Sequence, residues 1–472
     1  MTDTPIIVWF RRDLRITDNP ALSEAAKTGR AVIPLYIFET DAERALGAAS
    51  LWWLHHSLKS LQKDLADMGL EFCLRKGRAS DILESIIGQT GAKAVYWNRR
   101  YAKEARERDE AIKSHMGERE IEARSFRANL LSEPWKVETK TGGYYKVFTP
   151  YWRAAKDYLD VEDPLPAPKN VSAHSGTIAS DDLDNWQLLP SRPDWGEKMK
   201  PHWTIGSQGA KAALESFLGG PVEEYAEDRN RPDKEDGTSR LSPHLAFGEI
   251  SPKQIWHGCK GDLEKARVFL SEIGWREFSY VLLFHNPKLA TENFKDAFDN
   301  FEWNHNEAKL ERWQHGQTGY PFVDAGMRQL WQTGWQHNRV RMVTASFLIK
   351  HLLIDWREGE KWFHDTLVDA DPASNAASWQ WVAGSGADAS PYFRIFNPFT
   401  QGEKFDPNGD YVRRFVPELS KLPKKYIHRP WEAPQNVLDY AGVKLGRDYP
   451  KPIVDHKKAR EKALAAYKAS RE

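Results

Sequence analysis

The sequence predicts a protein in two parts, an N-terminal α/β domain and an all-helical domain joined by a long linker. Over the first third of the chain, short apolar runs rich in β-branched and aromatic residues alternate with helix-like stretches, which is typical of a parallel sheet. From about residue 201 onward helical periodicity dominates and no convincing strand remains. We therefore expect an α/β domain over residues 1–130, a linker over 131–200 and a helical domain over 201–472.

Four apolar runs in the first domain predict strands, and the stretches between them predict helices. The expected strands are PIIVWF (5–10), AVIPLYIF (31–38), LEFCLR (69–74) and KAVYWN (93–98), and the clearest helices cover 51–67 and 101–114. No GxGxxG follows the first strand, so we expect a Rossmann-like sheet without the ordinary dinucleotide fingerprint. The stretch 157–182 is rich in Pro, Ser and Asp, which favours a linker.

The amino-acid composition excludes several classes of protein. Lys and Arg total 67 and Asp and Glu total 67, so any attraction for nucleic acid must come from a local basic surface. Two cysteines, Cys73 and Cys259, are too few for a disulfide framework, a four-cysteine zinc site or an iron–sulfur cluster, and we expect no metal. Because no apolar run approaches about 18 residues and the N-terminus lacks a signal-peptide layout, we expect a cytoplasmic monomer with no membrane contact.

Two segments predict helix starts that suit a ligand. Ser242 precedes a proline, a helix-start signal, and the Gly-Thr-Ser-Arg turn before it offers hydroxyls, amide N–H groups and a cation for phosphate. Asp371 predicts a second N-cap, after which Asn375 and Trp379 share one helix face and Trp381 lies on another. Small residues around this start allow a planar ligand to approach the backbone. Capping alone would also explain both segments.

Two apolar helices, 269–284 and 334–356, carry polar groups on one face. These groups are Glu272, Trp275, Arg276 and Ser279 in the first helix, and Asn338, Arg341 and Met342 in the second. Interior Asn and Arg side chains need partners, and Asp369 and Asp371 are available. A packed ion pair and a methionine that fills the core are the structural alternatives.

Taken together, these segments resemble the photolyase/cryptochrome superfamily, specifically DNA photolyases that act on cyclobutane pyrimidine dimers. The similarity runs from VWFRRDLRITDNPAL (8–22) through GTSRLSPHLAFGEISP, TGYPFVDAGMRQL and SWQW to PYFRIFNPFTQGEKFDPNGDYVRRFVPEL (391–419). The resemblance implies a helical domain that binds FAD in a folded shape. It also implies an enzyme in which excited reduced flavin donates an electron to a dimer flipped out of UV-damaged DNA, double or single stranded.

The resemblance further implies roles for individual residues. Those expected to bind FAD are Tyr225, Thr238, Ser239, Arg240, Leu241, Ser242, Arg276, Trp335, Arg341, Asp369, Asp371 and Asn375, the last facing the reactive ring nitrogen of the flavin. The expected catalytic lesion pocket consists of Glu272, Trp275, Asn338, Met342 and Trp381, with the two tryptophans wedging the lesion. The expected electron relay consists of Trp379, Trp356 and Trp303, and the expected contacts to DNA phosphates are Arg229 and Arg339.

The same resemblance implies a second, light-harvesting chromophore. We expect 5,10-methenyltetrahydrofolate, with 8-hydroxy-5-deazaflavin as the alternative. One folate-binding version of the family holds the pterin with an Asn-Glu pair, where this chain has Lys103 and Glu104, so the glutamate is kept and the asparagine is not. Trp52 and Trp53 are candidates for lining a different folate pocket, and helix packing explains them equally well.

Three alternatives share part of this pattern. A cryptochrome photoreceptor has the same fold, but this chain ends soon after PIVDHKKAREKALAAYK and keeps Trp275, Asn375 and Trp381. A photolyase for (6-4) lesions would carry a histidine-rich motif near 335–345, where this chain has His337 alone. A redox flavoenzyme for small molecules would need a nicotinamide site, and no fingerprint for one is present.

Overall fold

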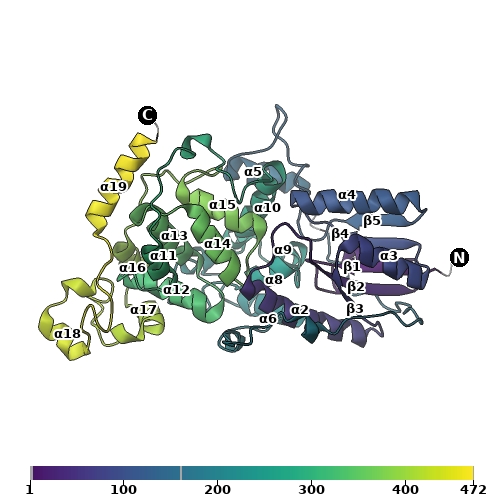
Figure 1. Ribbon diagram of the computed structural model, residues 1–472, viewed down its shortest axis with the longest axis horizontal. Helices are drawn as coiled ribbons and strands as arrows, with labels where there is room; N and C mark the ends of the chain where they lie inside the picture. Colours follow the sequence, from purple (N-terminus) through teal and green to yellow (C-terminus); the bar gives the residue numbers. More distant parts are fainter. Residues whose placement is uncertain (1–3, 160–161, 471–472) are drawn as a thin grey trace. The chain divides into compact units, whose positions relative to one another are not determined.

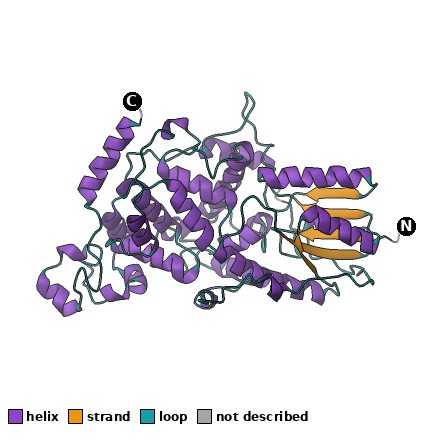
Figure 2. Ribbon diagram, in the orientation of Figure 1, coloured by secondary structure: helices purple, strands orange, loops and turns teal. Residues whose placement is uncertain are grey.

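The computed structural model describes residues 4–159 and 162–470, which divide into two compact units. Unit 1 comprises Met1–Gly219 and Arg240–Pro287, and unit 2 comprises Gly220–Ser239 and Lys288–Glu472. The strands belong to unit 1, and unit 2 is built from helices (Figure 2). The predicted α/β and helical architecture is therefore confirmed, while the domain boundaries near residues 130 and 200 stay a prediction.

Unit 1 contains a parallel five-stranded sheet with the strand order β3-β2-β1-β4-β5. The strands are β1 (Ile6–Phe10), β2 (Val32–Glu39), β3 (Cys73–Gly77), β4 (Ala94–Asn98) and β5 (Glu122–Phe126). The predictions for β1, β2 and β4 are confirmed, whereas β3 begins later than the run at 69–74 suggested. Its apolar residues Leu70 and Phe72 are buried in the loop before the strand.

Alternating side chains bury the sheet on both faces. Ile7 and Trp9 belong to one apolar cluster with helix residues such as Leu83 and Met116, whereas the intervening Val8 is equally buried on the opposite face. The helices of this unit are α1 (Pro20–Lys27), α2 (Ala48–Asp67), α3 (Ala79–Thr90), α4 (Lys103–Glu118), α5 (Phe148–Ala155), α6 (Ser207–Leu218), α8 (Ser242–Phe247), α9 (Pro252–Gly258) and α10 (Arg267–His285) (Figure 1).

The expected linker packs against the sheet within unit 1. The Val32 amide of β2 donates to the Ser172 carbonyl at 2.8 Å, and the Asp181 amide donates to the Leu74 carbonyl of β3 at 2.7 Å. Residues 172–181 thereby cover the β3 side of the sheet, which would otherwise expose unpaired backbone groups.

Unit 2 buries a large aromatic core that includes Trp313, Trp356, Tyr411 and Tyr449. Its helices are α7 (Tyr225–Asp228), α11 (Glu307–Gln314), α12 (Pro321–Thr333), α13 (Asn338–Ser346), the π-helix η5 (Phe347–His351), α14 (Trp356–Thr366), α15 (Pro372–Ala383), α16 (Pro398–Phe405), α17 (Asp410–Phe415), α18 (Gln435–Ala441) and α19 (His456–Ala469). Short 3₁₀ turns cover Asp296–Phe298, Pro417–Leu419 and Pro430–Glu432 in this unit, and Lys156–Tyr158, Leu183–Trp186 and Lys200–His202 in unit 1. Within the described ranges, no helix combines the length and apolarity that crossing a membrane requires.

Of the two predicted helix N-caps, the structure confirms Asp371 and contradicts Ser242. Asp371 is the N-cap of α15, and its Oδ1 accepts from the amides of Ala373 at 3.0 Å and Ser374 at 2.7 Å, which confirms that prediction. Ser242 is the first residue of α8 rather than its N-cap, so that prediction is wrong. The reason is that Leu241 before it already has near-helical dihedral angles, with φ −80° and ψ −5°.

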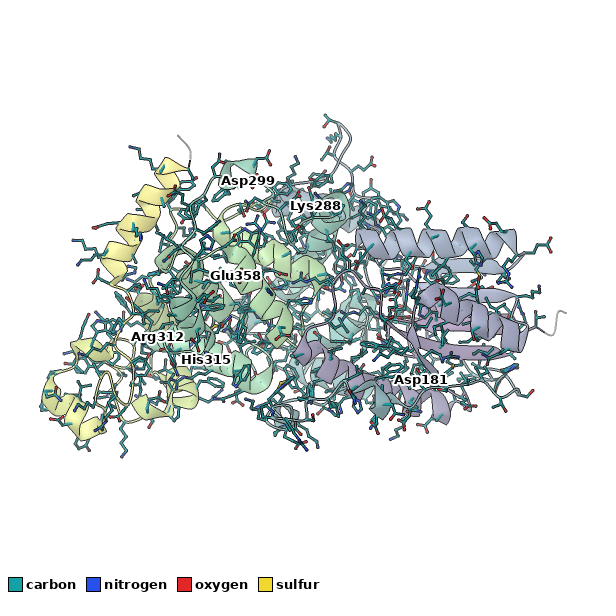
Figure 3. All side chains as sticks on the ribbon, in the orientation of Figure 1. Asp181, Lys288, Asp299, Arg312, His315 and Glu358 are labelled. Atoms are coloured by element: carbon teal, nitrogen blue, oxygen red, sulfur yellow. The ribbon has the colours of Figure 1, made fainter. Side chains whose placement is uncertain are left out.

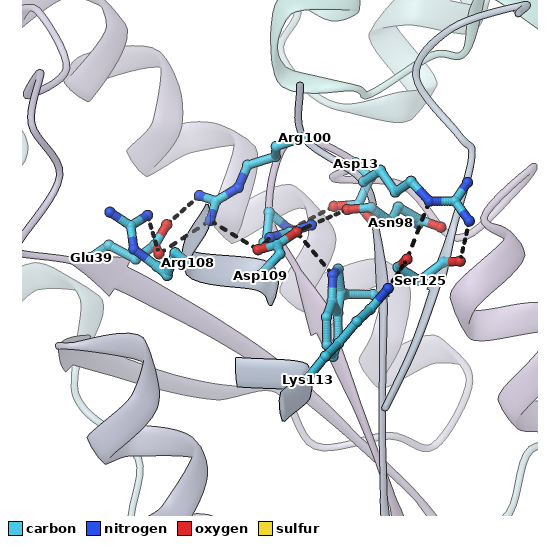
Figure 4. Close-up of polar contacts among 11 residues, drawn as sticks. Asp13, Glu39, Asn98, Arg100, Arg108, Asp109, Lys113 and Ser125 are labelled. Carbon is cyan, nitrogen blue, oxygen red and sulfur yellow. Dashed lines mark hydrogen bonds and ion pairs between the residues drawn. The ribbon is translucent and has the colours of Figure 1, made fainter. Parts of the chain in front are cut away.

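A buried charge network lies at the carboxyl ends of β1 and β4, where the strand order reverses (Figure 4). The Arg11 guanidinium donates to both carboxylate oxygens of Asp109, at 2.6 and 3.0 Å, and also to the carbonyl of Asn98. The Trp97 indole donates to Asp109 at 3.0 Å. Such switch points ordinarily form the ligand crevice of an open α/β sheet. In this sheet, ion pairs and an indole fill the position.

Replacing Asp109 by Ala should strongly destabilise the protein. The substitution leaves the buried Arg11 guanidinium without its carboxylate, and removing one partner of a buried ion pair costs about 3–5 kcal/mol. Chemical denaturation at neutral pH measures this loss. Asp448→Ala is the control, because the Arg447–Asp448 pair is at the surface and its loss should leave the unfolding midpoint unchanged.

The pH dependence provides a second measure of the same interaction. Burial raises the pKa of Asp109, but Arg11 and Arg100 outweigh it and lower the net pKa. The stabilisation that ionised Asp109 contributes is therefore fully present above the pKa that this carboxyl has in the unfolded chain. It is lost as the pH falls through the lower pKa that Asp109 has in the folded protein. A stability difference between the wild type and Asp109→Ala that stayed constant down to strongly acidic pH would contradict this account.

Candidate functional site

Helix α15 carries four side chains that contact different surroundings. Asn375 and Trp379 lie one turn apart, and Gln380 and Trp381 follow Trp379 directly. Trp379 and Gln380 are buried, whereas Trp381 is half-buried. The rotation of about 100° per residue separates the surfaces that these side chains meet.

The amide of Asn375 is held in one orientation by helix α14. Its Nδ2 donates to the carboxylate Oε1 of Glu360 at 2.8 Å and to the Glu360 carbonyl at 3.0 Å. Glu360 is buried, and a carboxylate accepts but does not donate when ionised. The amide nitrogen must therefore face Glu360, which leaves the carbonyl oxygen Oδ1 on the opposite side of the side chain.

Trp379 packs against α14 at a glycine. A Cβ atom placed on Gly359 would lie 2.1 Å from Cη2 of Trp379, so no larger residue fits without displacing the ring. The indole also makes edge-to-face contacts with Phe363, at a centroid distance of 5.0 Å, and with Trp313 at 6.2 Å. This packing fixes how α15 is rotated about its axis.

Gln380 anchors the segment before residue 295. Its Nε2 donates to the carbonyls of Leu289 at 2.7 Å and Glu292 at 2.8 Å, and its Oε1 accepts from the Phe294 amide at 2.8 Å. Gln380 is completely buried, so these bonds satisfy an otherwise costly polar group. The residue between the two tryptophans is therefore structural.

A partly buried ion pair joins Arg341 of α13 to Asp369, which lies just before α15. Asp369 Oδ2 accepts from the Arg341 guanidinium at 2.8 Å, and Arg341 Nε donates to the Gln336 carbonyl at 2.7 Å. The guanidinium also lies 5.9 Å from the ring centroid of Trp335. Within the described part of the chain, the buried Oδ1 of Asp369 has no hydrogen-bond partner, so it can accept from a bound molecule.

Trp356 and Trp303 occupy different depths in unit 2. Trp356 is fully buried, and its indole donates to Asn293 Oδ1 at 2.9 Å. Asn293 in turn donates to Asp299 at 2.7 Å (Asp299 is labelled in Figure 3). Trp303 is partly buried, with its ring centroid 4.3 Å from that of Phe301.

Two arginines of unit 2 lie near one another. The Arg339 guanidinium donates to Asn230 Oδ1 at 2.6 Å and lies 4.5 Å from the ring centroid of Phe405. Burial and the neighbouring charge of Arg229 lower the pKa of Arg339. Arg229 itself lies 5.7 Å from the ring of the buried Tyr225. Both arginines are half-buried, so this small basic area has an accessible part.

The predicted residues of unit 1 lie on α10 and in the turn before α8. Trp275 stacks on Phe148 with a centroid distance of 3.9 Å and an interplanar angle of 11°. Arg276 donates to the Asn129 carbonyl at 2.7 Å, and Glu272 is half-buried on the same helix. In the turn, Arg240 has a φ of +51° and lies 4.3 Å from the Trp203 ring centroid.

The predicted site residues are distributed between the two units. Unit 2 brings together Trp335, Arg341 and Asp369 by direct contact, and α15 joins Asp371, Asn375, Trp379 and Trp381 on one helix. Asn338 is exposed and Met342 half-buried on α13. Tyr225, Thr238 and Ser239 also belong to unit 2, whereas Arg240, Leu241, Ser242, Glu272, Trp275 and Arg276 belong to unit 1. In the described ranges, no cluster of three or more His, Cys, Asp or Glu side chains is suited to hold a metal.

Sequence reasoning missed two residues that position the site. Gly359 allows Trp379 to approach α14, and Glu360 orients Asn375. Both lie in the segment DWREGEKWF, where an isolated glycine within a helical pattern is a recognisable signal. The pairing of Glu360 with Asn375 depends on a tertiary contact and leaves no pattern in the sequence.

Replacing Gly359 by Ala should destabilise unit 2 and alter the environment of Trp379. Overpacking a well-packed core costs about 1–3 kcal/mol, and the clash is with a rigid indole. Chemical denaturation and near-ultraviolet circular dichroism measure the two effects. Gly88→Ala on α3 is the control, since that position is exposed and open and alanine favours helix. Equal stability of both variants would contradict the close approach of Trp379.

Comparison with known proteins identifies the family. The family model for DNA photolyase matches residues 6–169, and the model for the FAD binding domain of DNA photolyase matches residues 269–469. The chain is 55% identical to a deoxyribodipyrimidine photo-lyase of Agrobacterium fabrum, with 98% of each chain covered. It is 40% identical to cryptochrome-1 of Arabidopsis thaliana, covering 96% of this chain and 69% of that relative.

Solved structures agree with these matches. The crystal structure of a bacterial class III photolyase from Agrobacterium tumefaciens matches with a TM-score of 0.97 and 55% identity, covering 100% of this chain and 98% of that chain. A Synechocystis cryptochrome matches with a TM-score of 0.88 and 28% identity, covering 99% of this chain and 100% of that chain. The chain belongs to the DNA photolyase family of the photolyase/cryptochrome superfamily, and its helical part is an FAD-binding domain.

Proposed function

We propose that this protein repairs cyclobutane pyrimidine dimers in UV-damaged DNA with light and bound FAD. The observation that carries the proposal is the arrangement of α15, which presents Asn375, the buried Trp379 and the half-buried Trp381 to separate surroundings. Repair requires a group that orients the cofactor, a path for electrons and an accessible wall for the lesion. We further propose a cytoplasmic monomer that acts on double- or single-stranded DNA.

The residues of unit 2 fit a large polar cofactor. The buried Asp369 Oδ1 can accept a hydrogen bond, while Arg341 fixes the other carboxylate oxygen. Trp335 supplies a buried aromatic surface beside this pair. The other proposed FAD contacts are Tyr225, Thr238, Ser239, Arg240, Leu241, Ser242, Arg276, Asp371 and Asn375. When bound and reduced, FAD supplies the electron that light transfers to the lesion.

Asn375 is the proposed neighbour of the flavin ring. Because Glu360 occupies its amide nitrogen, Asn375 offers its carbonyl oxygen, which accepts a hydrogen bond from a ring N–H without bringing a full negative charge close. Glu360 thus acts as a positioning residue. Replacing its carboxylate by an apolar side chain would free the amide to turn.

The lesion pocket is proposed from the residues that the resemblance to photolyases implies. Trp275 and Trp381 provide aromatic surfaces for the flipped-out dimer, and base–aromatic stacking contributes about 1–3 kcal/mol per base. Glu272, Asn338 and Met342 are proposed to complete the pocket, and each is at least partly accessible. The basic area of Arg229 and Arg339 is proposed to contact phosphates beside the flipped nucleotides.

In repair, the electron moves from the reduced flavin to the lesion. The proposed tryptophan relay instead carries electrons from the protein surface to an oxidised flavin. Trp379 lies on the helix of Asn375, Trp356 is buried on α14, and Trp303 is partly accessible. This sequence of depths is what a path from the surface to the cofactor requires. The hydrogen bond from Trp356 to Asn293 holds the middle indole in place.

The structure of His337 favours cyclobutane dimers over (6-4) lesions. Burial, then Arg339 and Arg341, lower the pKa of His337 to about 3, and its Nδ1 accepts from the Arg339 amide at 3.2 Å. This low pKa favours the neutral form of the ring at physiological pH. A cryptochrome-type photoreceptor remains the alternative, and dimer repair by the purified protein distinguishes the two.

Two conservative variants test the proposal. In Trp379→Phe, blue light should reduce oxidised FAD poorly, because phenylalanine keeps the shape but is harder to oxidise. The same variant, with its flavin reduced chemically beforehand, should repair a dimer-containing oligonucleotide at close to the normal yield. Trp381→Phe should behave in the reverse manner, with normal photoreduction and weaker dimer binding or repair.

The two assays are flavin absorbance under illumination and repair after prior reduction. Trp431→Phe is a matched control. This partly buried tryptophan packs against Phe399 and Tyr320 and belongs neither to the proposed lesion pocket nor to the proposed electron relay. Loss of both activities in Trp379→Phe, with FAD content and fold retained, would contradict separate roles for the tryptophans of α15. Absence of dimer repair in the wild type under light would contradict the function itself.

We propose methenyltetrahydrofolate as the second chromophore, with Glu104 as a partner of the pterin N–H groups. Glu104 is half-buried, and burial together with Glu43 raises its pKa. The switch point of the sheet is already filled by Arg11 and Asp109, which disfavours a deazaflavin there. Trp52 and Trp53 are both buried, and the Trp53 indole donates to Glu249 at 3.0 Å, which favours their role in packing.

The absorption spectrum of the purified protein, with mass spectrometry of the released chromophores, tests this assignment. Glu104→Gln should lower the folate content while FAD stays constant, because a neutral amide replaces the acceptor for the pterin. Glu107→Gln on the same helix is the matched control, because that side chain is exposed and pairs with Lys103. A deazaflavin, or folate retained in Glu104→Gln, would contradict the proposal.

A further inference from the structure

A chain of hydrogen bonds joins the buried indole of Trp356 to the surface of unit 2. The Trp356 side chain is fully buried, and its indole N–H donates to Asn293 Oδ1 at 2.9 Å. Asn293 Nδ2 donates in turn to the carboxylate of Asp299 at 2.7 Å, and Asp299 is exposed. A neutral amide therefore separates the indole N–H from an ionisable carboxylate.

The segment that carries Asn293 is fixed by helix α15. Gln380 of that helix donates to the Glu292 carbonyl and accepts from the Phe294 amide, both at 2.8 Å. These two bonds hold the residues on either side of Asn293, which is itself buried. Because an indole N–H only donates and an ionised carboxylate only accepts, the amide oxygen must face the indole and the amide nitrogen must face Asp299.

Charges of both signs lie around Trp356. The Arg357 guanidinium is 4.8 Å from the Trp356 ring centroid and pairs with Asp355 at 3.0 Å. Asp299 adds a negative charge beyond Asn293. Together these three charged side chains carry one net negative charge. A positive charge that arises on the indole is therefore not opposed by an uncompensated cation beside the ring.

The acidity of the indole N–H changes when Trp356 is oxidised. In the proposed relay, Trp356 gives one electron to Trp379 and then takes one electron from Trp303, which returns it to its closed-shell state. Between these two transfers the indole is a radical cation, and its N–H is strongly acidic. A carboxylate in contact with this N–H would take the proton. An amide oxygen accepts the hydrogen bond but is too weak a base to remove the proton.

We propose that Asn293 is a positioning residue that keeps the proton of Trp356 on its indole nitrogen while the electron passes. One electron leaves Trp356 and one returns, and no bond to hydrogen is broken. Burial of the indole supports this role, because bulk water does not reach the N–H. The inference rests on the relay part of the proposed function.

The hydrogen bond is tested first, in the dark, by NMR of the FAD-loaded protein ¹⁵N-labelled at its indole nitrogens. Trp356→Phe identifies the Trp356 signal by its disappearance. Asn293→Leu should accelerate hydrogen exchange of this N–H about three- to tenfold, the usual effect of one neutral hydrogen bond. Asn300→Leu is the matched control at an exposed position and should leave the exchange rate unchanged. Equal exchange rates in Asn293→Leu and the wild type would overturn the proposal.

The fate of the proton is tested by transient absorption after a light pulse, with the flavin oxidised. Trp303→Phe stops the supply of electrons, so the radical stays on Trp356, and cationic and neutral tryptophan radicals have different visible spectra. In this background the radical should remain cationic. Adding Asn293→Asp places a general base at the N–H and should accelerate proton loss roughly a hundredfold. Adding Asn300→Asp instead is the matched control and should leave the radical cationic.

The pH profile of Asn293→Asp provides a readout that a purely structural role would not produce. The introduced carboxyl group adjoins Asp299, and two adjacent carboxylates resist ionising together. At low pH the introduced group therefore keeps a proton and imitates the amide. Proton loss from the oxidised indole should appear only as the pH rises, whereas Asn300→Asp should show no such dependence.

The outcomes separate this inference from the relay itself. If Trp356→Phe photoreduced FAD normally, the relay would be wrong and the role of Asn293 would fall with it. If Trp356→Phe lost photoreduction, but the Trp303→Phe radical lost its proton as fast as in the Asn293→Asp background, the relay would stand. Only the role of Asn293 would then be wrong.

Discussion

The contact between Gly359 and Trp379 is the constraint on which the helical unit depends. An indole that packs directly against a glycine leaves α15 one rotational position relative to α14. That position sets the direction of every other side chain on the helix, because successive residues are offset by a fixed angle. The Asn375–Glu360 hydrogen bond one turn earlier is compatible with the same rotation. The Gly359–Trp379 packing and the Asn375–Glu360 hydrogen bond therefore each support the same rotation of α15 about its axis.

The fold was largely predictable because its signals are local. Apolar runs such as those of β1 and β4 are buried on both faces and therefore continuous in the sequence. Strand β5 was missed because it lies at the sheet edge, where Glu122 and Arg124 alternate with less polar residues and weaken the pattern. Strand β3 was misplaced because Leu70 and Phe72 are buried in a loop, and burial alone does not distinguish a strand from a packed turn.

Around the predicted site, a local feature such as the helix cap was predictable, whereas the supporting tertiary contacts were not. Asp371 was recognisable as a cap because capping is a property of adjacent residues. Glu360 was not, because its role exists only once α14 and α15 are packed together. The switch point gives a similar example. The sequence showed that the ordinary glycine fingerprint is missing after β1, but not that Arg11 and Asp109 would occupy the position.

The three consecutive residues Trp379, Gln380 and Trp381 have a consequence for how members of this superfamily can diverge. Trp379 contacts α14, Gln380 anchors the segment around residue 290, and Trp381 is the accessible member. Since each side chain meets a different part of the molecule, a substitution at one position leaves the partners of the other two in place. On the proposed roles, exchange of Trp381 alone would therefore impair repair and leave the fold and the electron relay in place.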